Sequence, residues 1–190
     1  MTRPPQTPYD PPGGWEVQEG VGVPDALARL WTPHRMAYLQ GAGRPTPEGD
    51  GCPFCRIPTL ADAEGLVVRR GAVAYVVLNL FPYNSGHVLV VPYRHVADYT
   101  ALTEPELLEV ARLTRQAMTA IRGASGAHGF NIGMNQGTIA GAGIAAHLHQ
   151  HVVPRWGGDS NFMPVVAQTK VLPQLLADTR ELLASHWPAG

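Results

Sequence analysis

Three histidines alternate along one short stretch of the chain: His147, His149 and His151, in the string His-Leu-His-Gln-His-Val-Val. Residues i, i+2 and i+4 of a β-strand project from the same face. A strand over 147–153, which Pro154 would end, therefore places three imidazoles in a row. Imidazole titrates near neutrality and acts as a nucleophile, a base or a metal ligand. The pattern predicts a reactive site or a metal site, with the polar face of an edge strand as the plain alternative.

A glycine-rich segment, 137–143, precedes the histidines and contains Gly137, Gly141 and Gly143. Glycine allows a loop to bend so that successive backbone amides face an anion. A row of imidazoles beside such a loop favours chemistry on a phosphate group.

The only two cysteines, Cys52 and Cys55, form the string Cys-Pro-Phe-Cys. This spacing is typical of half a zinc site or of a redox pair. The redox motif requires a preceding strand and a following helix, whereas a Gly/Pro/Thr-rich segment precedes these cysteines and Arg-Ile-Pro follows them. Zinc would need two further ligands, which histidines would have to supply. Two reduced cysteines in a tight turn are the alternative.

Composition limits the class of protein. The 190 residues carry a formal net charge of −1 and a sequence pI of about 6.7, so no basic excess points to nucleic acid or to a membrane surface. No apolar run reaches the length of a membrane span, and the first residues do not form a signal peptide. We expect a cytoplasmic protein with a flexible Pro/Gly-rich tail over 1–22 and a single domain over 23–190.

Apolar periodicity and turn residues predict the elements that position these groups. A hairpin of strands 66–70 and 72–79 is followed by a buried strand over 87–92. Thr103 and Glu106 have the spacing of a capping box and begin a helix that Gly123 closes. Strands over 130–135 and 147–153 and a helix over 172–183 complete the list. This order predicts an α+β fold in which two main helices pack on an antiparallel sheet.

The histidine string resembles the signature of the histidine-triad (HIT) superfamily, His-φ-His-φ-His-φ-φ, with Gln150 at one φ position that points away from the histidines. The motifs that precede it occur in the family's order over about 50–155: Asn79 before Phe-Pro, Gly86-His87-Val-Leu-Val-Val-Pro92, and Asn135-Gln-Gly137. The segments 31–38, 51–56 and 149–156 look closer to one branch, the actinobacterial diadenosine tetraphosphate (Ap4A) phosphorylases.

The resemblance implies a HIT-like fold and a role for each matching residue. His149 would carry a nucleotidyl group, and His151 would bind phosphate oxygens or the leaving group. Asn79 would contact ribose, His87 would lie near the α-phosphate, and Asn135 would bond a phosphate or bridging oxygen. A strand cap, a core histidine and a turn residue are the respective structural alternatives for these last three. The stretch 142–144 lacks the hydroxyl that many members carry there, which puts the leaving-group contact in question.

The resemblance also implies a structural Zn²⁺ held by Cys52, Cys55, His95 and His147. The substrates would be Ap4A and inorganic phosphate, and the products ATP and ADP. A hydrolase that releases AMP and ATP, a nucleoside phosphoramidate hydrolase and a nucleotide sensor are the alternatives. Members are usually dimers, so we expect a homodimer or a higher homo-oligomer, with the helix over 103–123 as a possible contact.

Overall fold

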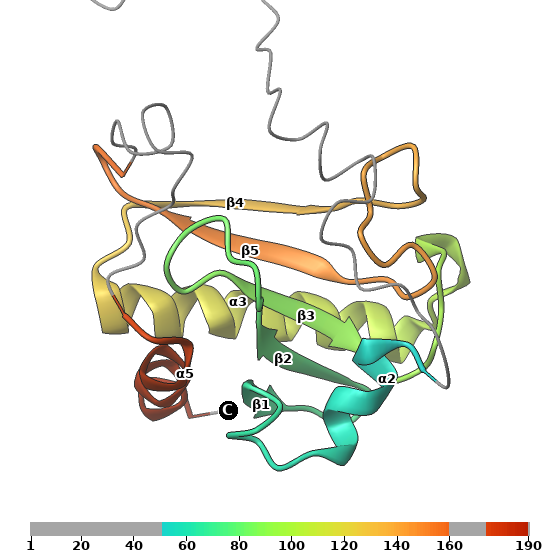
Figure 1. Ribbon diagram of the computed structural model, residues 1–190, viewed down its shortest axis with the longest axis horizontal. Helices are drawn as coiled ribbons and strands as arrows, with labels where there is room; N and C mark the ends of the chain where they lie inside the picture. The colour runs from blue at the N-terminus through green and yellow to red at the C-terminus, as the bar shows by residue number, and fades with distance from the viewer. Residues whose placement is uncertain (1–50, 160–173, 190) are drawn as a thin grey trace, which may run out of the picture. The chain divides into compact units, whose positions relative to one another are not determined.

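The computed structural model describes residues 51–159 and 174–189. The predicted tail over 1–22, its boundary with the domain, and the predicted start of the last helix at residue 172 lie outside the described residues. The described part of the chain forms a five-stranded antiparallel sheet with helices packed on it (Figure 1). The predicted α+β class and antiparallel sheet are confirmed.

The strands are β1 (Val67–Arg70), β2 (Ala74–Leu78), β3 (Val88–Pro92), β4 (Gly129–Met134) and β5 (Gln150–Arg155), in the spatial order β1-β2-β3-β5-β4. Every residue of β2 and β3 is buried, as expected for central strands of branched apolar residues. The predicted hairpin is the β1–β2 pair. The histidine strand β5 lies between β3 and β4, so it is internal to the sheet.

The helices are α2 (Pro53–Arg56), α3 (Glu104–Ser125) and α5 (Leu176–Ser185), with short 3₁₀ turns η1 (Ile57–Thr59) and η2 (Tyr99–Ala101). The predicted capping box of Thr103 and Glu106 is present at the start of α3. The predicted end at Gly123 is wrong, because the helix continues to Ser125 and is capped by Gly126. Gly126 adopts φ 63° and bonds the carbonyl of Arg122, the left-handed cap that favours glycine.

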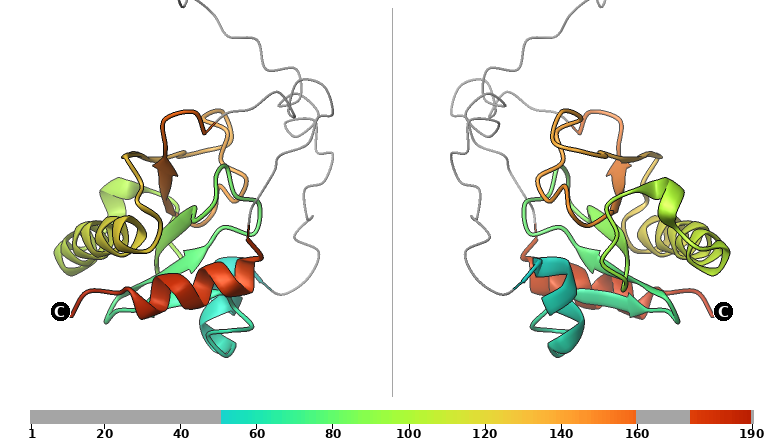
Figure 2. Two further views of the ribbon diagram at one scale, coloured as in Figure 1. Left: turned by 90° about the vertical axis from the view of Figure 1, so that its left-hand side faces the viewer. Right: turned by 90° about the vertical axis from the view of Figure 1, so that its right-hand side faces the viewer.

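The two faces of the sheet are covered differently. Helices α3 and α5 pack on one face, where Val76, Val90 and Val152 meet Leu113 and Leu183 (Figures 1 and 2). Each such side chain, fully buried, contributes on the order of 1.5–3 kcal/mol. The opposite face carries a smaller apolar cluster in which Phe54 of α2 packs against side chains of β1, β2 and β3.

The histidine strand differs at both ends from the predicted span of 147–153. It begins at Gln150 because Leu148 donates its backbone N–H to the Val96 carbonyl at 2.6 Å, outside the ladder between strands. It runs through Pro154, which pairs with Phe130 of β4. Strand β3 pairs β5 only as far as Val152. Pro154 therefore lies where β5 has a single neighbour, and a residue without an N–H is tolerated there.

A membrane span was not expected from the sequence. Among the described residues, no helix combines the length and the apolar character needed to cross a bilayer.

Candidate active site

His151 projects from β5 on the face of the sheet opposite α3, and His147 and His149 lie just before β5 begins. These three residues are called the histidine row. The ring centroids of His149 and His151 lie 5.1 Å apart, and Leu148 and Val152 belong to apolar clusters on the other side. Gln150 also points away from the histidines, donating through Nε2 to Thr114 Oγ1 of α3 at 2.6 Å. Gln150, the polar residue at an otherwise apolar position of the motif, is thus hydrogen-bonded to Thr114 and does not reach the histidines.

His149 has one ring nitrogen committed to the backbone. It is 7% exposed, and its Nδ1 lies 2.9 Å from the carbonyl oxygen of His147. A carbonyl only accepts hydrogen bonds, so Nδ1 carries the proton and Nε2 carries the lone pair. Burial lowers the pKa of His149, against the hydrogen bond to the backbone that raises it. The ring is thereby held as a neutral imidazole with a nucleophilic Nε2.

His151 carries its proton on the other ring nitrogen, Nε2. The Tyr83 backbone N–H donates to His87 Nδ1 at 3.0 Å, so neutral His87 carries its proton on Nε2. That Nε2 lies 2.9 Å from His151 Nδ1, which must accept and leaves the hydrogen of His151 on Nε2. Burial, with a smaller effect from His149, lowers the pKa of His151 to about 4. His151 is therefore a neutral N–H donor beside neutral His149, whose Nε2 carries a lone pair.

The loop between β2 and β3 supports this pair. Asn79 accepts the backbone N–H of Phe81 through Oδ1 at 3.0 Å and approaches His87 Nδ1 through Nδ2 at 3.3 Å. The Tyr83 ring stacks on His151, with centroids 5.6 Å apart and an interplanar angle of 15°. Asn79 and His87, predicted as substrate contacts, are thus joined to the histidine row through this loop.

The predicted phosphate loop begins where β4 ends. Asn135 follows the last residue of β4, and its neighbour Gln136 is anchored to the Tyr99 N–H at 3.0 Å and to Asp98 at 3.1 Å. Gly137 and Gly141 adopt φ 80° and 84°, which glycine favours, whereas Gly143 is exposed and has no positive φ. The Gly141 N–H donates to the Thr138 carbonyl at 3.0 Å, so this amide is used inside the loop.

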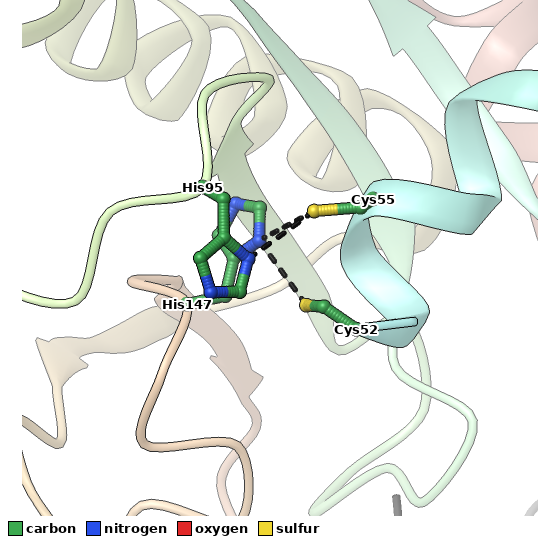
Figure 3. Close-up of side chains that lie close together, drawn as sticks. All are labelled: Cys52, Cys55, His95 and His147. Carbon is green, nitrogen blue, oxygen red and sulfur yellow. Dashed lines mark hydrogen bonds between the residues drawn. The ribbon is translucent and has the colours of Figure 1, made fainter. Parts of the chain in front are cut away.

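The four predicted metal ligands converge. The donor atoms of Cys52, Cys55, His95 and His147 lie within 4.8 Å of one another (Figure 3). Cys52 Sγ is 3.2 Å and Cys55 Sγ 3.5 Å from His147 Nδ1, and Cys55 Sγ is 3.3 Å from His95 Nδ1. A tetrahedral zinc site separates such atoms by roughly 3.5–3.8 Å, so this group could hold a metal ion.

The ring of His147 links that cluster to the histidine row. Its Nε2 bonds the Pro92 carbonyl at 2.9 Å, which fixes the proton there and turns Nδ1 toward the sulfurs. Its own carbonyl is the acceptor for His149. One residue therefore serves the cysteine cluster through its side chain and the candidate nucleophile through its backbone.

Two residues at the site were not predicted from the sequence. Phe54 contacts the rings of both His147 and His149. Tyr83 stacks on His151 and makes a tilted contact with His87. Their positions inside Cys-Pro-Phe-Cys and inside the loop before His87 were the only signal. An aromatic residue next to a motif is compatible with simple packing, and only the fold brings it onto a histidine ring.

Comparison with known proteins identifies the family. The family model of the HIT domain matches residues 62–158, just over half of the chain. The chain belongs to the HIT family. The match includes His149 and the loop before His87 but begins after the two cysteines, so the Cys-Pro-Phe-Cys turn of this HIT protein lies outside it.

Individual relatives extend the comparison. An AP-4-A phosphorylase of Mycobacterium tuberculosis is 53% identical over 172 residues, which cover 88% of each chain. An asymmetrical bis(5'-nucleosyl)-tetraphosphatase of Schizosaccharomyces pombe is 34% identical over 93 residues, 49% of this chain and 50% of its own. Among solved structures, a Zn-bound histidine triad family protein from Mycobacterium smegmatis superposes with a TM-score of 0.58 and 26% identity, covering 72% of this chain and 92% of its own.

Proposed function

We propose that this HIT protein is a nucleotidyl-transferring phosphorylase that cleaves Ap4A with inorganic phosphate to give ATP and ADP. The observation that carries the proposal is the hydrogen bond from His149 Nδ1 to the His147 carbonyl, which leaves Nε2 as a nucleophile beside the donor His151. The choice of substrate rests on the 53% identity to an AP-4-A phosphorylase.

The first half of the reaction forms a covalent intermediate. His149 Nε2 attacks the α-phosphorus of one adenylyl group, a P–N bond forms, and the P–O bond to the remaining tetraphosphate chain breaks. ATP leaves with the bonding electron pair, and the Nε2–H of His151 donates to an oxygen at the reacting phosphorus. Because both rings start neutral, no proton has to be removed before the attack.

The second half returns the enzyme to its starting state. An oxygen of inorganic phosphate attacks the same phosphorus, the P–N bond breaks, and ADP is released while His149 regains its lone pair. We infer that Asn135 and the loop 137–143 contact phosphate oxygens and that Asn79 contacts the ribose. His87 keeps His151 in the donor form.

We also propose that the cysteine cluster binds Zn²⁺ as a structural ion. Two sulfurs and two imidazole nitrogens fill a tetrahedron without an open position, so the ion would orient residues instead of binding substrate. A Zn-bound relative supports this choice of metal. We expect a homodimer as well, with a mass in solution of about twice 20.4 kDa by light scattering.

Product analysis with and without phosphate tests the reaction. Incubation with Ap4A should give ATP and ADP only when inorganic phosphate is present, and ³²P-labelled phosphate should appear in the β-position of ADP. ATP and AMP formed equally well without phosphate would make the protein a hydrolase, the activity named for the fission-yeast relative. No product in either condition would exclude both assignments.

Covalent catalysis has its own test. His149→Ala should lower kcat by at least about a thousand-fold, and no nucleotidylated protein should be trapped by rapid acid-free quenching. His186→Ala, at an exposed histidine of the α5 C-terminus, is the matched control and should retain full activity. Substantial turnover by His149→Ala would exclude a histidine-bound intermediate at this position.

A further inference from the structure

We propose that Phe54 is a positioning residue that braces the imidazole of His149, so that the Cys-Pro-Phe-Cys turn orients the nucleophile as well as the metal ligands. The inference rests on the proposed role of His149. It assigns a function to Phe54, one of the two residues between the cysteines, which is not among the predicted metal ligands.

The geometry places Phe54 against the nucleophile. Its ring centroid lies 4.9 Å from that of His149 at an interplanar angle of 46°, and 5.6 Å from that of His147 at 78°. Such tilted and edge contacts are favourable between aromatic rings. The ring of His151 also approaches His149, with centroids 5.1 Å apart and an interplanar angle of 64°. The imidazole of His149 is therefore in contact with two other rings.

Phe54 is itself fixed from three directions. It is 5% exposed and packs with Val67, Val77 and other side chains of the sheet. Its carbonyl accepts the hydroxyl of buried Tyr75 at 2.7 Å. Its neighbours in the α2 turn are Cys52 and Cys55, whose sulfurs lie beside His147. Movement of the cysteine turn would therefore be transmitted directly to the ring against His149.

His149 needs this support because a single hydrogen bond does not fix a ring. The bond at Nδ1 constrains one edge of the imidazole, but the ring can still swing about its Cβ–Cγ bond. Contact with the rings of Phe54 and His151 limits that freedom. In-line attack demands close alignment, and misplacement by about 1 Å can cost a hundred-fold in rate.

Phe54→Leu tests the inference because leucine keeps most of the apolar volume but offers no flat face. We expect kcat to fall about tenfold with KM changed less than about twofold, since substrate contacts are untouched. Zinc content per chain should stay that of the wild type. At pH 8, ¹⁵N–¹H correlation spectra of labelled histidine should change from one His149 tautomer, protonated at Nδ1, to a mixture.

Val77→Ala is the matched control, because Val77 packs in the same cluster as Phe54 but is aliphatic and cannot make the ring contacts of Phe54. It should lower the melting temperature while leaving kcat and the His149 tautomer unchanged. Tyr75→Phe is the second test variant, which removes the hydroxyl bonded to the Phe54 carbonyl and keeps both rings. It should shift kcat and the tautomer in the same direction as Phe54→Leu, by a smaller amount.

The spectra separate this inference from the proposed reaction. A tautomer change in Phe54→Leu supports the bracing role even if Ap4A is not the substrate, whereas absence of ATP and ADP in the wild type would overturn the reaction alone. An unchanged tautomer with an unchanged kcat in both Phe54→Leu and Tyr75→Phe would overturn the bracing role. Loss of kcat in Val77→Ala to the same extent would overturn it too, because general loosening of the cluster would then explain the effect.

Discussion

At the scale of single residues, two histidines that are two positions apart, His149 just before β5 and His151 within it, carry their protons on different ring nitrogens. His149 donates through Nδ1 to a carbonyl, and His151 accepts at Nδ1 from His87. The residue type is the same, so the difference comes from the hydrogen-bond partner that the fold brings to each ring. One imidazole offers a lone pair and the next offers an N–H, which is the combination that attack on phosphorus requires.

The buried row should make stability depend on pH. The pKa of His151 is lowered from an ordinary value of 6.5 to about 4 by burial, so the unfolded chain binds a proton that the native protein does not. Stability therefore falls as pH falls from 6.5 toward 4. Between pH 7 and pH 5 the free energy of unfolding, measured with urea, should fall by roughly 2 kcal/mol less in His151→Gln than in the wild type.

Comparison with the variant is necessary because burial also lowers the pKa of His147 and His149. Those two groups remain in both proteins and cancel in the difference. Equal losses of the wild type and of His151→Gln between pH 7 and pH 5 would show that His151 titrates normally in the native state.

At the scale of elements, an ion pair joins the end of β3 to the start of α3. Arg94 donates to the Glu106 carboxylate at 2.9 Å and 2.7 Å. The Thr103 backbone N–H also donates to Glu106 Oε2, at 2.8 Å. The Arg94 guanidinium and these bonds lower the pKa of Glu106 to about 2. Arg94 immediately precedes His95, so the pair also holds a predicted metal ligand in place.

Glu106→Gln should therefore weaken both the fold and the metal site. We expect a loss of about 1–3 kcal/mol in the free energy of unfolding at pH 7, because the buried group loses its charge-assisted bonds. The wild-type advantage should be complete above pH 4.5 and disappear as pH falls toward 2. A chelator competition assay should show weaker zinc binding.

Glu104→Gln is the control for this prediction, because Glu104 lies in the same first turn of α3 but is exposed. It should change stability by less than about 0.5 kcal/mol. Equal effects of the two substitutions would indicate a general interaction with the helix dipole instead of the Arg94 pair.

At the scale of the whole molecule, the cysteine cluster joins three parts of the chain that are distant in sequence. There the turn around Cys52 meets the segment after β3 that contains His95 and the segment before β5 that contains His147 (Figure 3). A metal ion bound by all three would stabilise the native state and not the unfolded chain.

Cys52→Ala should remove this ion, lower the melting temperature and reduce activity. Elemental analysis should find about one zinc per chain in the wild type and none in the variant. Arg56→Ala, at an exposed residue of the same α2 turn that is not a ligand, should keep the metal and the melting temperature. A wild type that is fully active and equally stable without metal would contradict a structural role for zinc.

The order of strands and helices could be predicted from the sequence because each depends on local patterns. Alternating or continuous apolar residues marked β1, β2 and β3, and the capping box of Thr103 and Glu106 marked α3. The ends of strands and helices were predicted less accurately, because they depend on contacts with segments that are distant in the sequence. Strand β5 continues through Pro154, because β3 no longer pairs with β5 at that position. Helix α3 continues past Gly123, because the left-handed cap forms at Gly126.

By itself, the sequence determined the alternation of His147, His149 and His151 and the pairing of Cys52 with Cys55, because residue types and short spacings carry this information. Its resemblance to the HIT superfamily added the family and named His95 and His147 as the further ligands of the cysteine cluster. Only the tertiary structure decided which nitrogen of each histidine holds the proton, since the Tyr83 N–H and the His147 carbonyl make that choice through hydrogen bonds. It also placed Phe54 on His149. Contacts between residues about a hundred positions apart depend on how the strands pair and on which face α2 covers, and no local pattern encodes them.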